Sequence, residues 1–396
     1  MSERGRSVEA LFAVLLFFLG GILLALFGPL AWAVTWGLLL FYLAAIWGGW
    51  NIPLGGMATR IETSPSAMRT LLCLCALVFV VGASELAAQA FTRFTRIEPP
   101  SPMKTLVPKG TEDWRLAHIT ADAYREPDPA LLWRPTRGGP YNAQRFKGPI
   151  AEIPKPADVF RIMTYGDSNT DGPPTGAWPE QLQQFLNTTA PKGTRFEVLN
   201  AGVAGYSSYQ GLVRLREEIS IYTPDLVVVS FGWNDLADAL GQPDQEFETP
   251  SELWLATQRL LLQFRFYRLL RSEAPPPDDS KKGPRVPLAD YIQNIQHFRE
   301  LTAENNADIL FLTRVTRSST EQLRRRSPNW RAQVPEYNAA LLELGARTQL
   351  PVLDVQTWFQ KNHPGAFVDE SHLSAEGRTQ MAQLLSEYLS ATPRGR

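Results

Sequence analysis

Phe160-Arg-Ile-Met-Thr-Tyr-Gly-Asp-Ser-Asn169 has the pattern of a strand that ends in a turn. An apolar run stops at Gly166, and an acid and a hydroxyl follow it at Asp167 and Ser168. In a parallel α/β sheet, ligands bind at the carboxyl ends of the strands, so this pattern places Ser168 at the edge of a crevice. We therefore predict that Ser168 is a nucleophile.

The chain that follows alternates between strand-like and helix-like runs. This alternation is typical of βαβ units around a parallel sheet, so we predict an α/β domain. Apolar stripes at helical spacing lie between the strands, and Ser374 is a good N-cap for the final helix. The predicted strands are Arg161–Tyr165, Phe196–Asn200, Leu226–Phe231, Ile309–Thr313 and Pro351–Val355.

Composition excludes several classes of protein. The chain has 396 residues, of which 44% are hydrophobic and 20% charged, and it is long enough for a sizeable core. Its net charge of −1 gives no basic field, so we expect no nucleic-acid partner. Cys73 and Cys75 are spaced poorly for a disulfide or a metal site. We find no metal cluster, phosphate loop or dinucleotide motif, and we expect no cofactor.

The N-terminal part has the composition of a membrane segment. Residues 10–59 contain no Asp, Glu, Lys or Arg, and one spanning helix needs only about 20 apolar residues. This length accommodates two helices, with Gly28-Pro29 as the break between them. We predict about three transmembrane helices within residues 1–90, at Glu9–Phe27, Leu30–Trp47 and Ala67–Ala88.

The arginines around these helices predict their orientation. Arg4 and Arg6 precede the first helix, and Arg60 and Arg69 flank the segment between the second and the third. The positive-inside rule then places the N-terminus in the cytoplasm and the chain after about residue 90 outside it. We predict a multi-pass protein of the inner (cytoplasmic) membrane with an extracytoplasmic catalytic domain. A cleaved signal peptide is the alternative, but its apolar region is only about 7–15 residues long.

We divide the rest of the chain into a linker and irregular lead-in at 91–156 and a catalytic domain at 157–396. An insertion at about 236–287 interrupts the alternation of strands and helices. Within it, Ser251–Arg271 resembles an amphipathic helix, which is either a lid or membrane-leaning appendage, or an extra packing helix on a plain tether. We favour the packing helix, since long loops are commonly plain linkers.

A serine nucleophile needs a base within hydrogen-bond reach and an acid that orients the base. The chain has four histidines. His118 lies in the lead-in, His297 lies in a helical stripe, and His363 has no acid one turn before it. His372 has Asp369 three residues upstream, so we predict His372 as general base and Asp369 as its partner.

Acyl transfer also needs hydrogen-bond donors for an oxyanion. Asn200–Gly205 follows the second predicted strand, and Gly232–Asp235 follows the third. We predict a bare backbone N–H at Gly202 and a side-chain amide at Asn234 as donors, together with the N–H of Ser168.

For other polar residues near these segments we expect structural roles. Asp167 and Asn169 are predicted turn formers, and Asp235 a brace of its loop. Arg314 and Arg317 begin an arginine-rich run after the fourth strand. We expect a solvated face there, with attraction of an anionic substrate or lipid headgroups as the alternative.

Four blocks occur in order, as Gly166-Asp-Ser168, Gly202, Gly232-Trp-Asn234-Asp235 and Asp369-Glu-Ser-His372. With these blocks, residues 157–392 resemble the SGNH, or GDSL-type, serine hydrolase superfamily. The resemblance implies a three-layer α/β/α, flavodoxin-like fold with strand order 2-1-3-4-5. It also implies a triad of Ser168, Asp369 and His372, with Gly202 and Asn234 in the oxyanion hole. The lead-in around Tyr141–Gly148 is similar to that of membrane-anchored bacterial members.

The predicted function is that of a membrane-anchored serine esterase that hydrolyses carboxylic (O-acyl) esters on envelope glycans or lipids. One alternative is an O-acyltransferase that hands the acyl group to an extracytoplasmic polysaccharide, since the same residues serve both reactions. The other is a non-catalytic SGNH-like scaffold that binds glycan. The expected partners are the ester substrate and the bilayer, and the sequence predicts no particular protein partner.

Overall fold

A computed structural model describes residues 65–97, 114–120, 124–239, 241–272, 283–318 and 330–391. The chain divides into two compact units. Unit 1 contains Met1–Pro108 and Leu253–Pro275, and unit 2 contains Lys109–Glu252 and Pro276–Arg396. The predicted helices Glu9–Phe27 and Leu30–Trp47 lie outside the described residues.

The centre of unit 2 is a parallel sheet of five strands in the order β4-β3-β5-β6-β7. This order confirms the predicted 2-1-3-4-5 arrangement. The chain leaves β3 toward β4 on one side and then continues with β5 on the other, so the carboxyl end of β3 is a switch point where ligands bind. The strands are β3 (Val159–Gly166), β4 (Arg195–Asn200), β5 (Leu226–Ser230), β6 (Asp308–Leu312) and β7 (Val352–Leu353).

The last strand is shorter than the predicted Pro351–Val355. Asp354 follows it directly and its side chain accepts the Thr357 N–H, which caps helix α15 (Val355–Asn362). The strand therefore ends at Leu353, because the cap begins the next helix at once.

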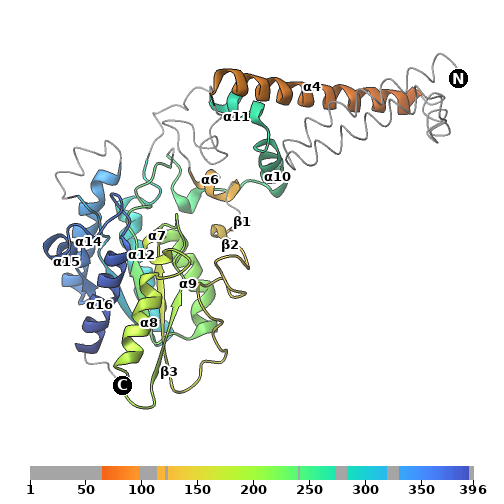
Figure 1. Cartoon of the computed structure of the whole chain (residues 1–396). Helices are drawn as coiled ribbons and strands as arrows, with labels where there is room; N and C mark the ends of the chain where they lie inside the picture. Colours follow the sequence, from red (N-terminus) through yellow and green to blue (C-terminus); the bar gives the residue numbers. More distant parts are fainter. Residues whose placement is uncertain are drawn as a thin grey trace. The chain divides into compact units, whose positions relative to one another are not determined.

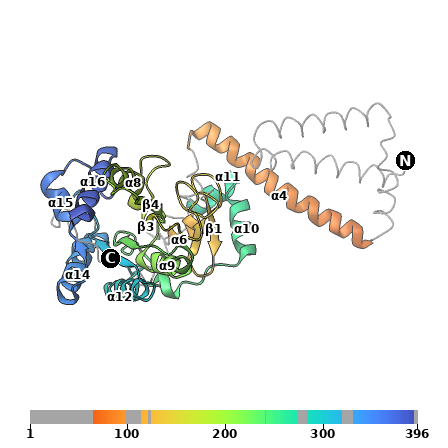
Figure 2. The same cartoon turned by 90° about the horizontal axis from the view of Figure 1, so that it is seen from below.

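Helices cover both faces of this sheet, which confirms the predicted three layers (Figures 1 and 2). One face carries α15 together with α8 (Trp178–Thr188) and α16 (Ala375–Ala391). The other face carries α9 (Ser208–Tyr222), α12 (Leu288–Glu304) and α14 (Val334–Thr348).

Alternate residues of the buried strands feed two apolar cores. Ile162, Val228 and Leu310 pack in the cluster that includes α8, α15 and α16. Phe311, the next residue on β6, instead meets Phe298 of α12 edge-on. Both faces of the strands are therefore apolar, as expected for a parallel sheet covered by helices.

The lead-in has regular structure of its own. It contains α6 (Trp114–Thr120) and an antiparallel hairpin of β1 (Arg125–Asp128) and β2 (Leu132–Pro135). The Tyr206 hydroxyl donates to the Trp133 carbonyl at 2.7 Å, which joins this hairpin to the loop after β4. The sequence predicted an irregular lead-in because strands of four residues that include proline have no clear periodicity.

Unit 1 contains α4 (Pro65–Thr95) and two helices from the insertion, α10 (Glu252–Leu261) and α11 (Arg265–Ser272). The Phe266 N–H donates to the Glu85 carboxylate at 3.3 Å, and the Arg265 guanidinium donates to the Thr92 hydroxyl at 3.0 Å. Both acceptors on α4 are buried. The single predicted helix Ser251–Arg271 is thus two helices, and the second packs on α4.

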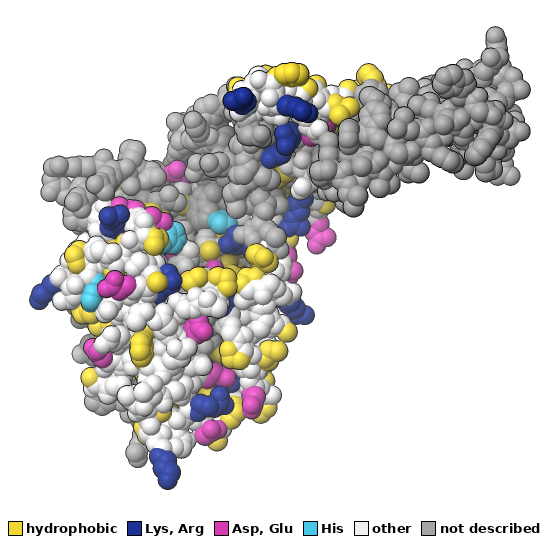
Figure 3. All heavy atoms as spheres, viewed as in Figure 1, with side chains coloured by type: hydrophobic (Ala, Val, Ile, Leu, Met, Phe, Trp, Pro, Cys, Tyr) yellow, Lys and Arg dark blue, Asp and Glu magenta, His cyan; other side chains and the backbone are white. Residues whose placement is uncertain are grey.

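Helix α4 contains the third predicted membrane span. Among the described residues, Ala76–Thr95 is the one helical stretch that is long and apolar enough to cross a bilayer. On the described surface that Figure 3 shows, basic and acidic side chains are interspersed with apolar and neutral ones. This mixture agrees with the net charge of −1.

Candidate active site

The nucleophile candidate stands at a tight turn between β3 and the short helix α7 (Ser168–Asp171). Asp167 is the N-cap, and its side chain accepts the Asn169 N–H at 2.9 Å. A Cβ at Gly166 would lie 2.1 Å from the Thr170 hydroxyl oxygen and 2.9 Å from the Ser230 carbonyl oxygen. Only glycine allows the helix to return this closely over the strand, and the turn leaves Ser168 partly exposed.

The structure brings the three predicted side chains into one row of hydrogen bonds. Ser168 Oγ lies 2.7 Å from His372 Nε2, although 204 residues separate them in the chain. His372 Nδ1 lies 2.8 Å from Asp369 Oδ2. Because a carboxylate only accepts, Nδ1 carries the proton and Nε2 is left to accept from the serine hydroxyl.

The second oxygen of Asp369 anchors the same loop, since it accepts the backbone N–H groups of Ser371 and His372 at 2.8 Å each. Partial burial raises the pKa of Asp369. The hydrogen bonds from these two N–H groups and from the imidazole outweigh burial, so the pKa lies below its usual value. Asp369 is therefore a carboxylate at neutral pH.

Asn169 holds the histidine loop against the nucleophile turn. Its amide donates to the Ser371 carbonyl at 2.6 Å, and its side-chain oxygen accepts the Leu373 N–H at 2.9 Å. The backbone on both sides of His372 is thus tied to the residue next to Ser168. The sequence predicted only a turn former here, because the partners lie more than 200 residues away.

Arg314 is buried beneath this junction rather than solvated as the sequence predicted. Its Nε donates to Asp167 Oδ2 at 2.8 Å, and Nη2 donates to the Ser371 carbonyl at 3.1 Å. Asn338 of α14 in turn pairs with both backbone groups of Arg314, at 2.7 and 2.9 Å. The ion pair with Asp167 compensates for the burial of the charge.

Two more predicted residues follow β5. The Asn234 amide donates to the Tyr206 carbonyl at 3.1 Å, which leaves the second amide hydrogen for another acceptor. The Asp235 carboxylate accepts the N–H groups of Gly232 at 2.9 Å and Ser208 at 3.0 Å, so it braces the loop. Burial raises the pKa of Asp235 to about 6.

Gly202 does not present the bare N–H that the sequence predicted. Its N–H donates to Asn200 Oδ1 at 3.0 Å. A Cβ at this position would lie 2.4 Å from the Asp171 nitrogen, so glycine is needed for the close approach of α7. The predicted role of the Gly202 N–H as a bare donor is therefore wrong for this structure, in which it is already paired with Asn200.

Gly205, three residues later, has an N–H without a hydrogen-bond acceptor among the described residues, and we call this the open N–H of the loop. The Ala204 N–H donates to the Asp171 carboxylate at 3.3 Å. The Tyr206 N–H donates to the Val203 carbonyl at 3.0 Å. Within the described residues the Gly205 N–H has no such partner, and its φ of 89° lies in the region that favours glycine. The sequence shows two glycines in Asn200–Gly205, but not which N–H is free.

Two of the other histidines pack against aromatic side chains. His118 stacks on Trp133 in the lead-in, and His363 packs against Trp358 and Phe359. In the part of the chain that the structure describes, no three His, Cys, Asp or Glu side chains are grouped to hold a metal ion.

The described site agrees with a comparison of the sequence with protein families. Residues 164–379 match the model of the GDSL-like lipase/acylhydrolase family. A search of curated proteins finds no match.

Solved structures with a similar fold include a lipase/acylhydrolase from Enterococcus faecalis. It is 19% identical, the match covers 60% of this chain and 99% of that one, and the TM-score is 0.39. A catalytic mutant of an acetylxylan esterase from Geobacillus stearothermophilus is 18% identical over 60% and 97% of the two chains, with a TM-score of 0.40. The family model spans more than half of the 396 residues, from the end of β3 into α16. The chain belongs to the GDSL-like lipase/acylhydrolase family and is an ester-bond hydrolase.

Proposed function

We propose that the protein is a membrane-anchored serine esterase that removes O-acyl groups from envelope glycans or lipids. The observation that supports this most directly is the distance of 2.7 Å between Ser168 Oγ and His372 Nε2. Asp369 continues the row at 2.8 Å. A hydroxyl, an imidazole and a carboxylate in this order are the groups that nucleophilic acyl transfer needs.

In the proposed reaction, Ser168 Oγ attacks the ester carbonyl while His372 Nε2 takes the hydroxyl proton. The tetrahedral intermediate collapses, the C–O bond to the alcohol breaks, and His372 returns the proton to the departing alcohol. Water then attacks the acyl-enzyme with His372 as base, which releases the acid and restores Ser168. Asp369 holds the imidazole tautomer and stabilises its positive charge in both steps.

The oxyanion needs donors that are open before the substrate arrives. Ser168 is the first residue of α7, so the helix itself does not use its N–H. Asn234 keeps one amide hydrogen. We assign the third donor to Gly205 in place of Gly202, because the Gly202 N–H is already paired with Asn200. Removal of one such donor costs about 3 kcal/mol of transition-state stabilisation.

The membrane part of the proposal rests on the sequence and on α4. The apolar stretch Ala76–Thr95 has the length of a spanning helix, and its exposed side chains include Leu77, Phe79 and Val80. With the predicted helices before it, α4 would leave the catalytic domain outside the cytoplasm. We keep the proposed division into residues 1–90, 91–156 and 157–396. An extracytoplasmic location favours acylated envelope components as substrates.

The test uses full-length protein purified in detergent. We expect hydrolysis of p-nitrophenyl acetate, butyrate or longer esters by the parent protein, and a loss of about 1,000-fold or more in kcat for Ser168→Ala. Ser220 is an exposed serine on α9, so Ser220→Ala is the matched control. A fluorophosphonate probe should label the parent and Ser220→Ala but not Ser168→Ala. Equal hydrolysis by Ser168→Ala and the parent would refute the proposal.

The substrate class needs a second measurement. Acetate released from an O-acetylated polysaccharide would support a glycan substrate, and fatty acid released from phospholipid vesicles would support a lipid. Activity on neither substrate, together with activity on small esters, would contradict the envelope assignment but not the esterase.

A further inference from the structure

Two buried guanidinium groups bind the loop that carries the open N–H of Gly205. Arg125 Nη2 donates to the Ala204 carbonyl at 3.1 Å, and Arg285 Nη1 donates to the Gly205 carbonyl at 2.7 Å. Arg125 belongs to β1 in the lead-in, and Arg285 lies near the end of the insertion, just before α12. Neither residue belongs to the four sequence blocks, and Arg125 lies before the region that matches the family model.

The first contact determines where the Gly205 N–H points. The Ala204 carbonyl and the Gly205 N–H belong to one trans peptide group. In such a group the C=O and N–H bonds point to opposite sides of the chain. A guanidinium that holds the carbonyl on one side therefore directs the N–H to the other side. The Tyr206 carbonyl of the same loop is also held, because it accepts a hydrogen bond from the Asn234 amide at 3.1 Å.

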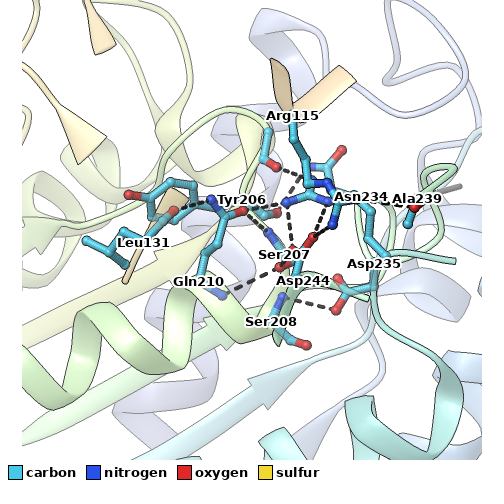
Figure 4. A network of polar contacts seen from close by, with 12 residues as sticks. Arg115, Leu131, Tyr206, Ser207, Ser208, Gln210, Asn234, Asp235, Ala239 and Asp244 are labelled. Atoms are coloured by element: carbon cyan, nitrogen blue, oxygen red, sulfur yellow. Dashed lines mark hydrogen bonds and ion pairs between the residues drawn. The ribbon is translucent and has the colours of Figure 1, made fainter. Parts of the chain in front are cut away.

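The second contact belongs to a buried ionic cluster, part of which Figure 4 shows around Asp244. Arg285 donates to both Asp244 oxygens, at 2.7 and 2.8 Å, and Arg115 donates to one of them at 3.1 Å. The three side chains are fully buried. Arg285 also donates to Gln210 Oε1 at 2.6 Å, so its guanidinium has a fixed orientation.

His118 lies beside the first contact, with its Nδ1 2.7 Å from Arg125 Nη1. Burial and then the charges of Arg125 and Arg285 hold its pKa well below the usual value, so it adds no charge.

We propose that Arg125 and Arg285 are positioning residues for the oxyanion hole, which hold the Gly205 N–H toward the developing negative charge. This inference rests on the proposed esterase function. Donors that are oriented before the reaction need no reorganisation at the transition state, so their effect appears in kcat. Through Arg125, β1 of the lead-in then helps to position the oxyanion hole.

The test compares Arg125 variants with a control from the same segment in full-length protein. Arg125→Met removes the hydrogen bond and the charge but keeps most of the apolar chain, and Arg125→Lys keeps the charge. Arg145→Met is the control, since Arg145 also donates to a lead-in carbonyl, that of Pro135, and pairs with Glu126. For each variant we would measure kcat, KM, the inhibition constant of an alkylboronic acid and the melting temperature.

We expect Arg125→Met to lower kcat about tenfold or more and to raise the inhibition constant of the boronic acid by a similar factor. KM should change little, because only the charged tetrahedral species uses the Gly205 N–H. Arg125→Lys should recover part of both losses, and Arg145→Met should show neither. Unchanged kcat in Arg125→Met, or equal losses in Arg145→Met, would overturn the inference. If Arg125→Met does not fold, Arg125→Lys decides by the same comparison. If the parent itself hydrolyses no ester, the proposed function fails first.

Discussion

At the scale of single residues, the notable contrast is between exposed and buried members of the site. The side chains of His372 and Asp369 are 42% and 56% exposed, so the hydrogen bond between them alone contributes little to holding the imidazole in place. Asn169 and Ser371 beside them are buried. The position of His372 over Ser168 therefore depends on hydrogen bonds made through the backbone of its loop.

This contrast predicts the effect of Asn169→Leu. Asn187→Leu is the matched control. The Asn187 amide also makes two hydrogen bonds with backbone groups, since it donates to the Phe196 carbonyl at 2.8 Å and accepts the Phe196 N–H at 2.9 Å. We expect Asn169→Leu to lower kcat about 100-fold, since a displacement of the base by about 1 Å has that effect. Both variants should lose about 1–2 kcal/mol of stability. Equal kcat values, measured per folded molecule, would show that the contact is only structural.

Asp235 predicts how stability changes with pH. Its pKa is raised to about 6 by burial, so the carboxyl group favours folding most when protonated. This contribution is fully present below the ordinary pKa near 4 and is lost as the pH rises through about 6. The difference amounts to about 3 kcal/mol at most. In Asp235→Asn, the melting temperature should depend less on pH between 4 and 6.5 than in the parent, and an unchanged dependence would contradict the assignment.

At the scale of elements, the site depends on how closely α7 approaches the loop after β4. Gly202 allows the contact, since a Cβ there would lie 2.4 Å from a backbone nitrogen of α7 and 2.7 Å from a backbone carbon. Backbone atoms cannot move aside as a flexible side chain can. The helix that begins with Ser168 would have to shift instead.

We therefore expect Gly202→Ala to destabilise the protein by about 1–3 kcal/mol and to lower kcat. Gly365 is the control, because a Cβ there meets nothing within 4 Å and its φ is not positive. Gly365→Ala should leave the melting temperature and kcat near the parent values. If Gly202→Ala behaved like Gly365→Ala, the close approach of α7 would have no role in stability or activity.

Elements also differ in how well the sequence predicts them. The strands β3 to β6 lie within two residues of their predicted bounds, because apolar runs between turn residues are a local signal. The hairpin of β1 and β2 and the break between α10 and α11 were not predicted. Short strands with proline and a helix broken at Leu262–Phe264 depend on the segments that they pack against.

At the scale of the whole molecule, the sequence predicts how the chain lies across a membrane. The arginine distribution predicts that the segment near Arg60 and the segment after α4 lie on opposite sides. An alkaline phosphatase reporter fused after Ile97 should be active outside the cytoplasm, and the same reporter fused after Arg60 should be inactive. Activity at neither position, or any activity after Arg60, would contradict the predicted count of spanning helices.

The sequence by itself determined the α/β class, the strand order through the family resemblance, and the residues Ser168, Asp369 and His372 whose side chains meet in the structure. The class and the three residues follow from local patterns, because strand ends, caps and the spacing of an acid before a histidine lie within a few residues of one another. Their catalytic roles stay predictions.

Only the tertiary structure decided which donors are open and which buried charges hold them. The occupied N–H of Gly202, the free one of Gly205 and the contacts of Arg125, Arg285 and Arg314 all depend on partners that other segments bring. A hydrogen bond depends on distance and direction in space, and residues as far apart as Arg125 and Ala204 share no local pattern. The sequence therefore contains these groups without showing their pairing.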